Sequence, residues 1–178
     1  HIELGCVLHS LMSPRELDLQ IAGGKVKSVI VGMGKAAVGD DIAFRAGDAD
    51  IVCTPVSVGN PHAVIFADDV EEIPLTVLGP QIEHHENFPG GVNVEFVQVL
   101  SEKELRMRVW ERGSGVTMAC GTGACASAAA AAARGYCEYD TPVSVHLDGG
   151  TLKIQIARNG AVTMAGPAEI VYEGEIAI

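Results

Sequence analysis

Six consecutive alanines, Ala128 to Ala133, follow a loop in which glycines are interspersed with small residues. Alanine is the strongest helix former, and a segment that is apolar all round predicts a buried helix approached closely on several sides. We expect this helix to span roughly Gly123 to Arg134, with Gly135 as its left-handed stop. This glycine-spaced loop carries Cys120 directly before the helix, so the pattern places a thiol at the N-terminus of the helix.

The surroundings of Cys120 favour chemistry. Gly121 and Gly123 let backbone N–H groups approach a ligand without interference from side chains. The helix start adds unpaired N–H groups and the positive end of the helix dipole, which suits a carboxylate. A thiol in that field is expected to have a lowered pKa and to become a thiolate near neutral pH. The alternative is a buried structural cysteine beside a glycine turn, since free cysteine is commonly buried.

Composition excludes several classes of partner. The 178 residues suffice for one domain, and 48% hydrophobic with only 4% aromatic residues means that Val, Ile, Leu and Ala build the core. A net charge of −11 argues against nucleic acid and anionic membranes as partners. An acidic ligand must therefore be held by a local device such as a helix N-terminus or a single arginine.

The five cysteines lack paired metal spacings, so reduced thiols in the cytoplasm fit better than a disulfide framework. We interpret four of them, Cys6, Cys53, Cys125 and Cys137, as structural. No apolar run reaches membrane-spanning length, and we expect no bound metal. The pair His84-His85 has no accompanying ligand cluster and is interpreted as a solvated helix end.

Strand patterns surround the helix. Glu16 to Ile21 alternates and turns through Ala22-Gly-Gly24 into Lys25 to Val31, which predicts a hairpin before a polar connection from Gly32. A short helix is expected at Leu75 to His85, although Gly79-Pro80 lies inside it. The other expected strands are Asp50 to Val58, Ala63 to Phe66, Val92 to Leu100, Glu104 to Arg112, Val143 to Leu147, Leu152 to Ala157, Ala161 to Met164 and Ala168 to Tyr172.

In the strand Glu104 to Arg112, alternation puts Leu105, Met107 and Val109 on the face of Glu111, which directs that glutamate inward. Short hairpins join most strands, at Asp148-Gly-Gly150 and Asn159-Gly160 among others. The expected fold is α+β, an antiparallel sheet wrapped around one buried central helix.

Taken together, the motifs resemble those of the diaminopimelate epimerase family. The matching segments lie in the family's order and with similar spacing, from about Glu16 to the C-terminus. They are Gly59-Asn-Pro-His-Ala63, Gly91-Val-Asn-Val-Glu-Phe96, Glu111-Arg-Gly-Ser-Gly115 and Ala119-Cys-Gly-Thr-Gly-Ala-Cys125. Gly166-Pro-Ala168 near the end also resembles the family's closing strand. Four ordered motifs are far more specific than one glycine-rich loop.

The resemblance implies a small amino-acid substrate, diaminopimelate, and inversion of one α-carbon without pyridoxal phosphate or any other cofactor. One cysteine removes the α-proton as a thiolate, and another delivers a proton to the opposite face as a thiol. Cys120 matches one member of that pair. With no cofactor to spread the carbanion's charge, preorganised dipoles must stabilise it, and the N–H groups of Gly121 and Thr122 suit that role.

The same resemblance assigns the polar neighbours. Arg112, Asn60 and Asn93 would hold the distal end of the substrate, because a guanidinium grips a carboxylate and amides suit either end. Glu111 would fix the reacting amino group, and His62 would support the same polar cluster. Each has an ordinary alternative: turn residues for the asparagines, a backbone partner for His62, and a solvated strand exit for Glu111-Arg112.

The family has two similar halves, each with one cysteine at a helix N-terminus, whereas this sequence shows one such loop. We therefore expect residues 1–14 to be a lead-in or remnant of a missing first domain. Residues 15–165 would form the second domain, and 166–178 a closing strand that returns to the first. Isolated, the chain is expected to be inactive, and an open sheet edge favours association, including a homodimer.

A different class of function also fits these residues. The chain could be a non-catalytic carboxylate-binding or assembly module that retains the fold, and redox sensing by Cys120 is a third, weaker hypothesis. Racemases of proline-like substrates and cysteine-free isomerases of the same fold fit less well. Glu111, Arg112, Asn60 and Asn93 suit a substrate that is polar at both ends.

Overall fold

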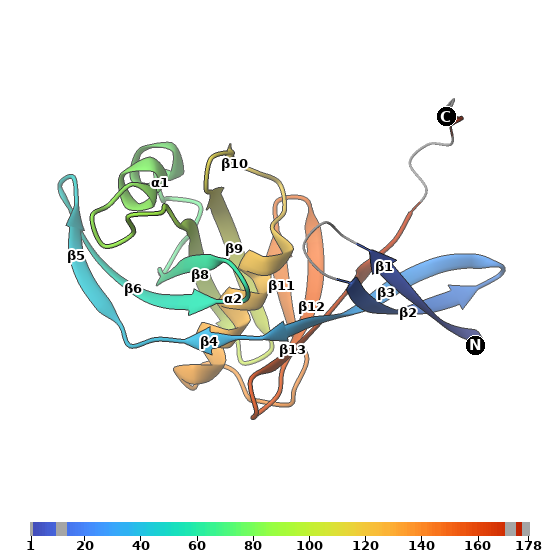
Figure 1. Cartoon of the computed structure of the whole chain (residues 1–178). Coiled ribbons are helices and arrows are strands. Elements are labelled where there is room, and N and C mark those ends of the chain that lie inside the picture. The colour runs from blue at the N-terminus through green and yellow to red at the C-terminus, as the bar shows by residue number, and fades with distance from the viewer. Residues whose placement is uncertain (1, 10–13, 170–173, 176–178) are drawn as a thin grey trace.

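A long curved sheet surrounds one central helix, α2 (Gly121–Ala133), in the computed structural model, which describes residues 2–9, 14–169 and 174–175 (Figure 1). Strands β4, β6, β7, β8, β9, β11, β12 and β13 all contact α2. Its residues from Gly123 to Ala132 are buried, as expected for a helix without a polar face. The predicted α+β fold with a sheet around one buried central helix is confirmed.

The strands follow one path along the sheet. In sheet order they are β1 (Ile2–His9), β2 (Pro14–Ala22), β3 (Lys25–Lys35), β13 (Ala161–Pro167), β12 (Gly150–Ile156), β11 (Val143–Leu147), β9 (Glu104–Glu111), β8 (Asn93–Ser101), β7 (Pro61–Phe66), β6 (Ala49–Ser57) and β4 (Ala37–Val38). Beside this path, β5 (Ile42–Ala46) pairs with β6, and β10 (Gly115–Val116) pairs with β9.

The sheet is mixed, which corrects the prediction of a purely antiparallel one. β7 runs parallel to β8, and β9 runs parallel to β11. Each parallel pair is separated in sequence by a helix, α1 (Leu75–Glu83) in the first case and α2 in the second. A hairpin reverses the chain, whereas a helical crossover returns it in the same direction. The remaining pairs are antiparallel.

The ends of α2 follow from its sequence. Cys120 is its N-cap, with φ −136° and ψ 107°. At the other end Gly135 adopts φ +76°, a conformation that glycine takes without strain. The N–H of Tyr136 donates to the carbonyl of Ala131 and the N–H of Gly135 to that of Ala132, which is the Schellman pattern of helix termination. The predicted glycine stop is confirmed, and the helix starts two residues earlier than the expected Gly123.

Two groups of buried side chains build the core. One surrounds α2 and includes the inward residues of β9, Leu105, Met107 and Val109, as predicted. The other lies under α1, which is the expected short helix, and includes Phe96 and Ile82. Because α2 presents only small side chains, the backbone of the helix comes close to the sheet on all sides.

Some elements differ from the sequence-based expectation. Residues 2–9 show no hydrophobic period, yet they form β1 by antiparallel pairing with β2. β3 continues to Lys35, and the expected polar connection after it contains β4 and β5. The expected strand at 168–172 begins with two residues that lie outside any strand, and its remainder falls outside the described residues. The division at residues 14 and 165 stays a prediction.

Candidate active site around Cys120

Cys120 caps the helix with its own sulfur. The Sγ atom accepts a hydrogen bond from the N–H of Gly123 at 3.3 Å, and the residue is 7% exposed. The hydroxyl of Thr122 lies 3.6 Å from the same sulfur. The loop therefore holds the thiol in a fixed position at the helix start, as the glycine spacing predicted.

The protonation state of Cys120 differs from the expectation. Burial raises the pKa of its thiol to about 11, and the nearby carboxyl group of Glu111 adds to that rise. The hydrogen bonds with Thr122 and Gly123 lower the pKa but do not compensate. The predicted lowering of the pKa is therefore wrong for this structure, because burial outweighs the helix N-terminus. Cys120 is a thiol at neutral pH.

Beside the thiol, the start of α2 offers unpaired donors. The carbonyl of Cys120 accepts the first helical hydrogen bond, from Ala124, and Gly123 donates to sulfur. The N–H groups of Gly121 and Thr122 have no partner among the described residues. Two free donors at the positive end of a thirteen-residue helix form an arrangement suited to a carboxylate.

A chain of polar side chains connects Cys120 with the interior. Asn60 donates from Nδ2 to Oγ1 of Thr122 at 3.3 Å, and its Oδ1 lies 3.1 Å from Nε2 of His62. Nδ1 of His62 lies 2.7 Å from Oε1 of Glu95. The side chains of His62 and Glu95 are fully buried. The structure thus brings three predicted residues, Asn60, His62 and Thr122, together with Cys120.

Glu95 was not among the predicted site residues. It is the third residue of β8, between two buried apolar neighbours, Val94 and Phe96. Burial raises the pKa of its carboxyl, and the hydrogen-bonded His62 only partly opposes the rise. A charged residue within an otherwise apolar strand was the signal that could have identified it, because a fully buried carboxyl is rare.

Glu111 and Arg112 occupy the end of β9 and the turn after it. The hydroxyl of Thr117 donates to Oε1 of Glu111 at 2.5 Å, and Glu111 is partly buried, on the predicted inward side. Arg112 is exposed, and its guanidinium donates to the carbonyl of Gly90 at 3.2 Å. Among the described residues, no hydrogen bond or ion pair joins Arg112 to Cys120.

Asn93 is committed to the backbone at both ends of its amide. Its Nδ2 donates to the carbonyl of Pro61 at 3.1 Å, and its Oδ1 accepts from the N–H of Arg112 at 3.0 Å. The side chain thereby ties the turn after β9 to the start of β7. Asn93 positions Arg112, and its role toward a substrate stays a prediction.

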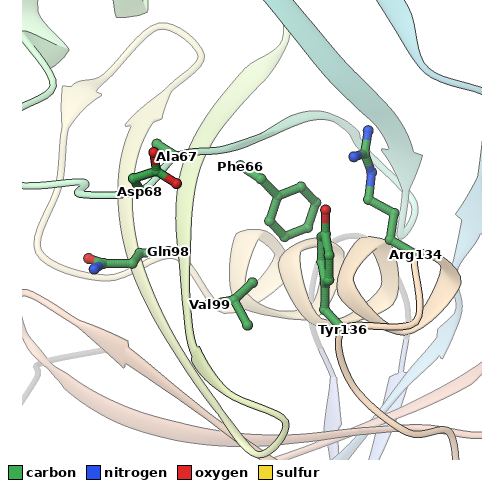
Figure 2. Close-up of a pocket in the computed structure, with 7 residues that line it drawn as sticks. All are labelled: Phe66, Ala67, Asp68, Gln98, Val99, Arg134 and Tyr136. Atoms are coloured by element: carbon green, nitrogen blue, oxygen red, sulfur yellow. The ribbon is translucent and has the colours of Figure 1, made fainter.

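An open cavity of about 510 Å³ lies at the opposite end of α2 (Figure 2). Arg134, the C-cap, lies with its guanidinium carbon 5.2 Å from the ring centre of Phe66 and pairs with Asp41. Phe66 also makes an edge contact with Tyr136. None of the predicted site residues lines this cavity, and the charge of its arginine is already paired. Its lining residues are Phe66, Ala67, Asp68, Gln98, Val99, Arg134 and Tyr136.

The described residues contain no group of three or more His, Cys, Asp or Glu side chains placed to hold a metal ion. The expectation that the site uses no metal and no cofactor stays a prediction. None of the helices in the described part of the chain is long and apolar enough to cross a membrane.

Comparison with known proteins identifies the family. Residues 54–171 match the family model of diaminopimelate epimerase. A diaminopimelate epimerase from Bacillus licheniformis is 45% identical over 190 residues, covering 99% of this chain and 67% of the relative. The chain belongs to the diaminopimelate epimerase family. The predicted family, and with it the isomerase class of its members, is confirmed.

Further members of the diaminopimelate epimerase family and of its fold agree. The Bacillus subtilis enzyme is 43% identical over 97% of this chain and 66% of its own length. Among solved structures, a predicted epimerase from Pseudomonas aeruginosa has a TM-score of 0.64 at 19% identity, over 96% of this chain and 68% of that one. A probable proline racemase from Agrobacterium radiobacter has a TM-score of 0.71 at 16% identity, over 96% and 61%. These two show the shared fold.

The chain spans about two thirds or less of the length of the curated relatives that it matches, with 67%, 42% and 66% in three of them.

Proposed function

We propose that this chain supplies one of the two acid/base thiols of a cofactor-independent epimerase that converts LL-diaminopimelate into meso-diaminopimelate, a reaction of lysine and cell-wall precursor synthesis. The observation that carries the proposal is the position of Cys120. Its sulfur caps α2 beside two free N–H groups, and a hydrogen-bonded chain of side chains leads from it to a buried carboxyl. Membership of the family supports the substrate class.

The free N–H groups of Gly121 and Thr122 would receive the substrate carboxylate next to the reacting carbon. When the α-proton leaves, negative charge moves from the carbon onto that carboxylate. Fixed dipoles at a helix start stabilise this charge without reorganising, which lowers the barrier to proton removal. Glu111, partly buried near Cys120, would accept hydrogen bonds from the substrate's ammonium group.

Cys120 would act as the acid. Its thiol is protonated at neutral pH, since its pKa is about 11. An opposed thiolate, supplied by a second segment, breaks the Cα–H bond and takes the proton. The electron pair then forms a new C–H bond with the proton of Cys120 on the opposite face, which leaves Cys120 as the thiolate. The reverse reaction exchanges the two roles, so each isomer begins from the opposite protonation state.

Arg112 and Asn60 would hold the distal end of the substrate from two sides of the polar cluster. The Arg112 guanidinium is exposed and has donors beyond the one that contacts Gly90. Asn93 would act here by holding the backbone of Arg112 in place. Cytoplasmic location and a homodimer complete the proposal. The buried thiols of Cys53 and Cys137, which form no disulfide, fit a reducing compartment.

The test is incorporation of deuterium from D₂O at the α-carbon of diaminopimelate by the full-length protein. We expect Cys120→Ser to reduce the exchange by about 10²–10⁴-fold, the usual contribution of a positioned acid or base. Cys137→Ser, a buried cysteine away from the helix start, serves as the matched control and should retain the exchange rate. Undiminished exchange in Cys120→Ser would remove this thiol from the mechanism. Binding of diaminopimelate without exchange by the wild type would favour a non-catalytic carboxylate-binding module.

A further inference from the structure

Glu95 is an ionisable residue in the core of the protein. Its side chain is fully buried on β8, in the interior of the sheet. Oε1 lies 2.7 Å from Nδ1 of His62, while Oε2 has no hydrogen-bond partner among the described residues. A buried carboxylate normally has both oxygens satisfied, because an unpaired charge in a core is costly. The arrangement therefore needs an explanation beyond packing.

The contacts of His62 show how many protons the pair holds. Nε2 faces Oδ1 of Asn60, an acceptor, at 3.1 Å, so Nε2 carries a hydrogen. Nδ1 then either accepts a hydrogen bond from a protonated Glu95 or donates to an ionised one. One proton is shared between the two side chains in both cases, and its position decides whether the pair consists of two neutral groups or of an imidazolium and a carboxylate.

Three observations favour the neutral pair. Oε2 is buried without a partner, which is tolerable for the carbonyl oxygen of a carboxylic acid and costly for a carboxylate. Burial raises the pKa of Glu95, and the nearby Glu111 raises it further. The ionisable groups that face Glu95 are His62 on β7, Glu111 on β9 and Cys120 before α2, so a carboxylate there would have only the imidazolium of His62 to compensate its charge.

With Glu95 as the acid, its O–H donates to Nδ1 of His62, and the other hydrogen bonds of the chain run in the same direction. His62 donates from Nε2 to Asn60, and Asn60 donates from Nδ2 to Oγ1 of Thr122 at 3.3 Å. Thr122 thus accepts one hydrogen bond, which leaves its own hydrogen for Sγ of Cys120 at 3.6 Å. Every donor in the chain points from the buried carboxyl toward the thiol.

We propose that Glu95 is a positioning residue for Cys120: as a neutral acid it fixes His62 in the Nε2–H form and so orients the hydroxyl of Thr122 toward the sulfur. The proposal rests on the proposed function only in taking Cys120 as the acid/base thiol. When Cys120 gives up its proton, the oriented O–H stabilises the thiolate that remains. When the thiolate takes a proton back, the hydroxyl of Thr122 loses little interaction energy, because it can also donate a hydrogen bond to the sulfur of a thiol.

Two variants test the role of Glu95. Glu95→Gln keeps the shape and places an amide N–H where the acid donates to Nδ1 of His62. Glu95→Leu removes the donor while filling a similar volume. Both are made in the 178-residue chain and followed without substrate, so the outcome does not depend on epimerase activity. The unfolding midpoint of each variant, measured in urea, shows that the protein compared is folded.

The first readout is the pair of ring ¹⁵N signals of His62. We expect a protonated Nε2 and an unprotonated Nδ1 in the wild type and in Glu95→Gln, with loss of the single form in Glu95→Leu. An imidazolium in the wild type at neutral pH, with both nitrogens protonated, would overturn the proposal, because Glu95 would then be an anion.

The second readout is the pH dependence of alkylation of Cys120 by iodoacetamide, followed by mass spectrometry of its peptide. We expect Cys120 in Glu95→Gln to be alkylated at a rate within about threefold of the wild type. In Glu95→Leu, at pH values below the midpoint of the alkylation profile, the rate should be about tenfold lower, as for a pKa of Cys120 raised by about one unit. Wild-type reactivity in folded Glu95→Leu would refute a role for Glu95. If the midpoint of the alkylation profile of Glu95→Gln lay a full pH unit below that of the wild type, the proposal that Glu95 is a neutral acid would be refuted. Failure of deuterium exchange, in contrast, would refute only the epimerase function.

Discussion

Gly123 and Glu95 lie so close together that no side chain fits between them. A Cβ atom at position 123 would stand 2.8 Å from Oε1 of Glu95 and 3.2 Å from Sγ of Cys120. The first turn of α2 is therefore packed directly against the first residues of β8. The glycine is required here by a close approach of helix and carboxyl, since its φ needs no left-handed conformation.

Gly123→Ala should destabilise the fold and disturb the thiol together. The methyl group has to displace a buried carboxyl or the sulfur, which costs about 1–3 kcal/mol in a packed core. Gly121→Ala is the matched control, because its Cβ would meet only the flexible side chain of Met164, at 3.2 Å. Urea unfolding measures both. Equal stability of the two variants would show that the contact with Glu95 yields without cost.

Glu83 should prove important for the turn that carries Glu111 and Arg112. Its carboxyl accepts from Nε1 of Trp110 at 2.6 Å and from the N–H of Gly113 at 2.8 Å, and the residue is buried. We expect Glu83→Ala to cost about 1–3 kcal/mol, because it leaves the indole donor without a partner. The exposed Glu86→Ala should stay within about 0.5 kcal/mol of the wild type in the same unfolding experiment. A neutral Glu83→Ala would mean that water replaces the carboxyl.

Gly79 in α1 should be intolerant of alanine, although alanine normally stabilises a helix by about 1 kcal/mol relative to glycine. A Cβ at this position would lie 2.5 Å from Cγ of Trp110, whose ring is held by Glu83. We expect Gly79→Ala to lower the free energy of unfolding by about 1–3 kcal/mol. The chain has a single tryptophan, so its fluorescence reports the displaced ring directly. A stabilised variant with unchanged fluorescence would contradict this packing.

Stability should decline at alkaline pH because of the buried thiols. Burial raises the pKa of Cys53 to about 12 and that of Cys120 to about 11, from an ordinary value of 9.0. Between pH 9.0 and the raised pKa of each thiol, the unfolded chain has released a proton that the folded chain retains. The free energy of unfolding therefore falls as the pH rises through that window. Each thiol contributes up to about 1.4 kcal/mol per pH unit in its window.

The expected signature is a flatter pH profile in a variant. Cys53→Ser removes one thiol with a raised pKa. As the pH rises above 9, the free energy of unfolding of this variant should therefore fall less than that of the wild type. Urea unfolding at a series of pH values measures the difference and cancels the titration of other groups. Profiles that stay parallel would show that Cys53 ionises in the folded protein as easily as in the unfolded one.

Much of the fold could be predicted because it depends on local pattern. The alanine run, Cys120 before it and Gly135 after it gave α2 with its caps. Short glycine-containing turns gave the hairpins β11–β12 and β12–β13. Strands without strong alternation, β1 and β4, were missed, because backbone pairing with a neighbour is what makes them strands.

The site was predictable in its residues and less so in its chemistry. Asn60, His62 and Thr122 do lie in one chain with Cys120. Their roles toward a substrate stay predictions. Arg112 stands apart from that chain, and Asn93 is used by the backbone. Glu95 was overlooked because the pattern of β8 does not reveal what lies across the sheet.

By itself, then, the sequence determined a buried small-residue helix with a thiol at its start, since propensity and capping act between near neighbours in the chain. Only the tertiary structure decided that β7 and β9 have parallel neighbours and that Glu95 lies beneath Gly123. It also decided that Cys120 is a thiol, with its pKa at about 11. The physical reason is that desolvation of the thiol and the approach of Glu111 depend on which segments the fold brings together, and these lie far apart in sequence.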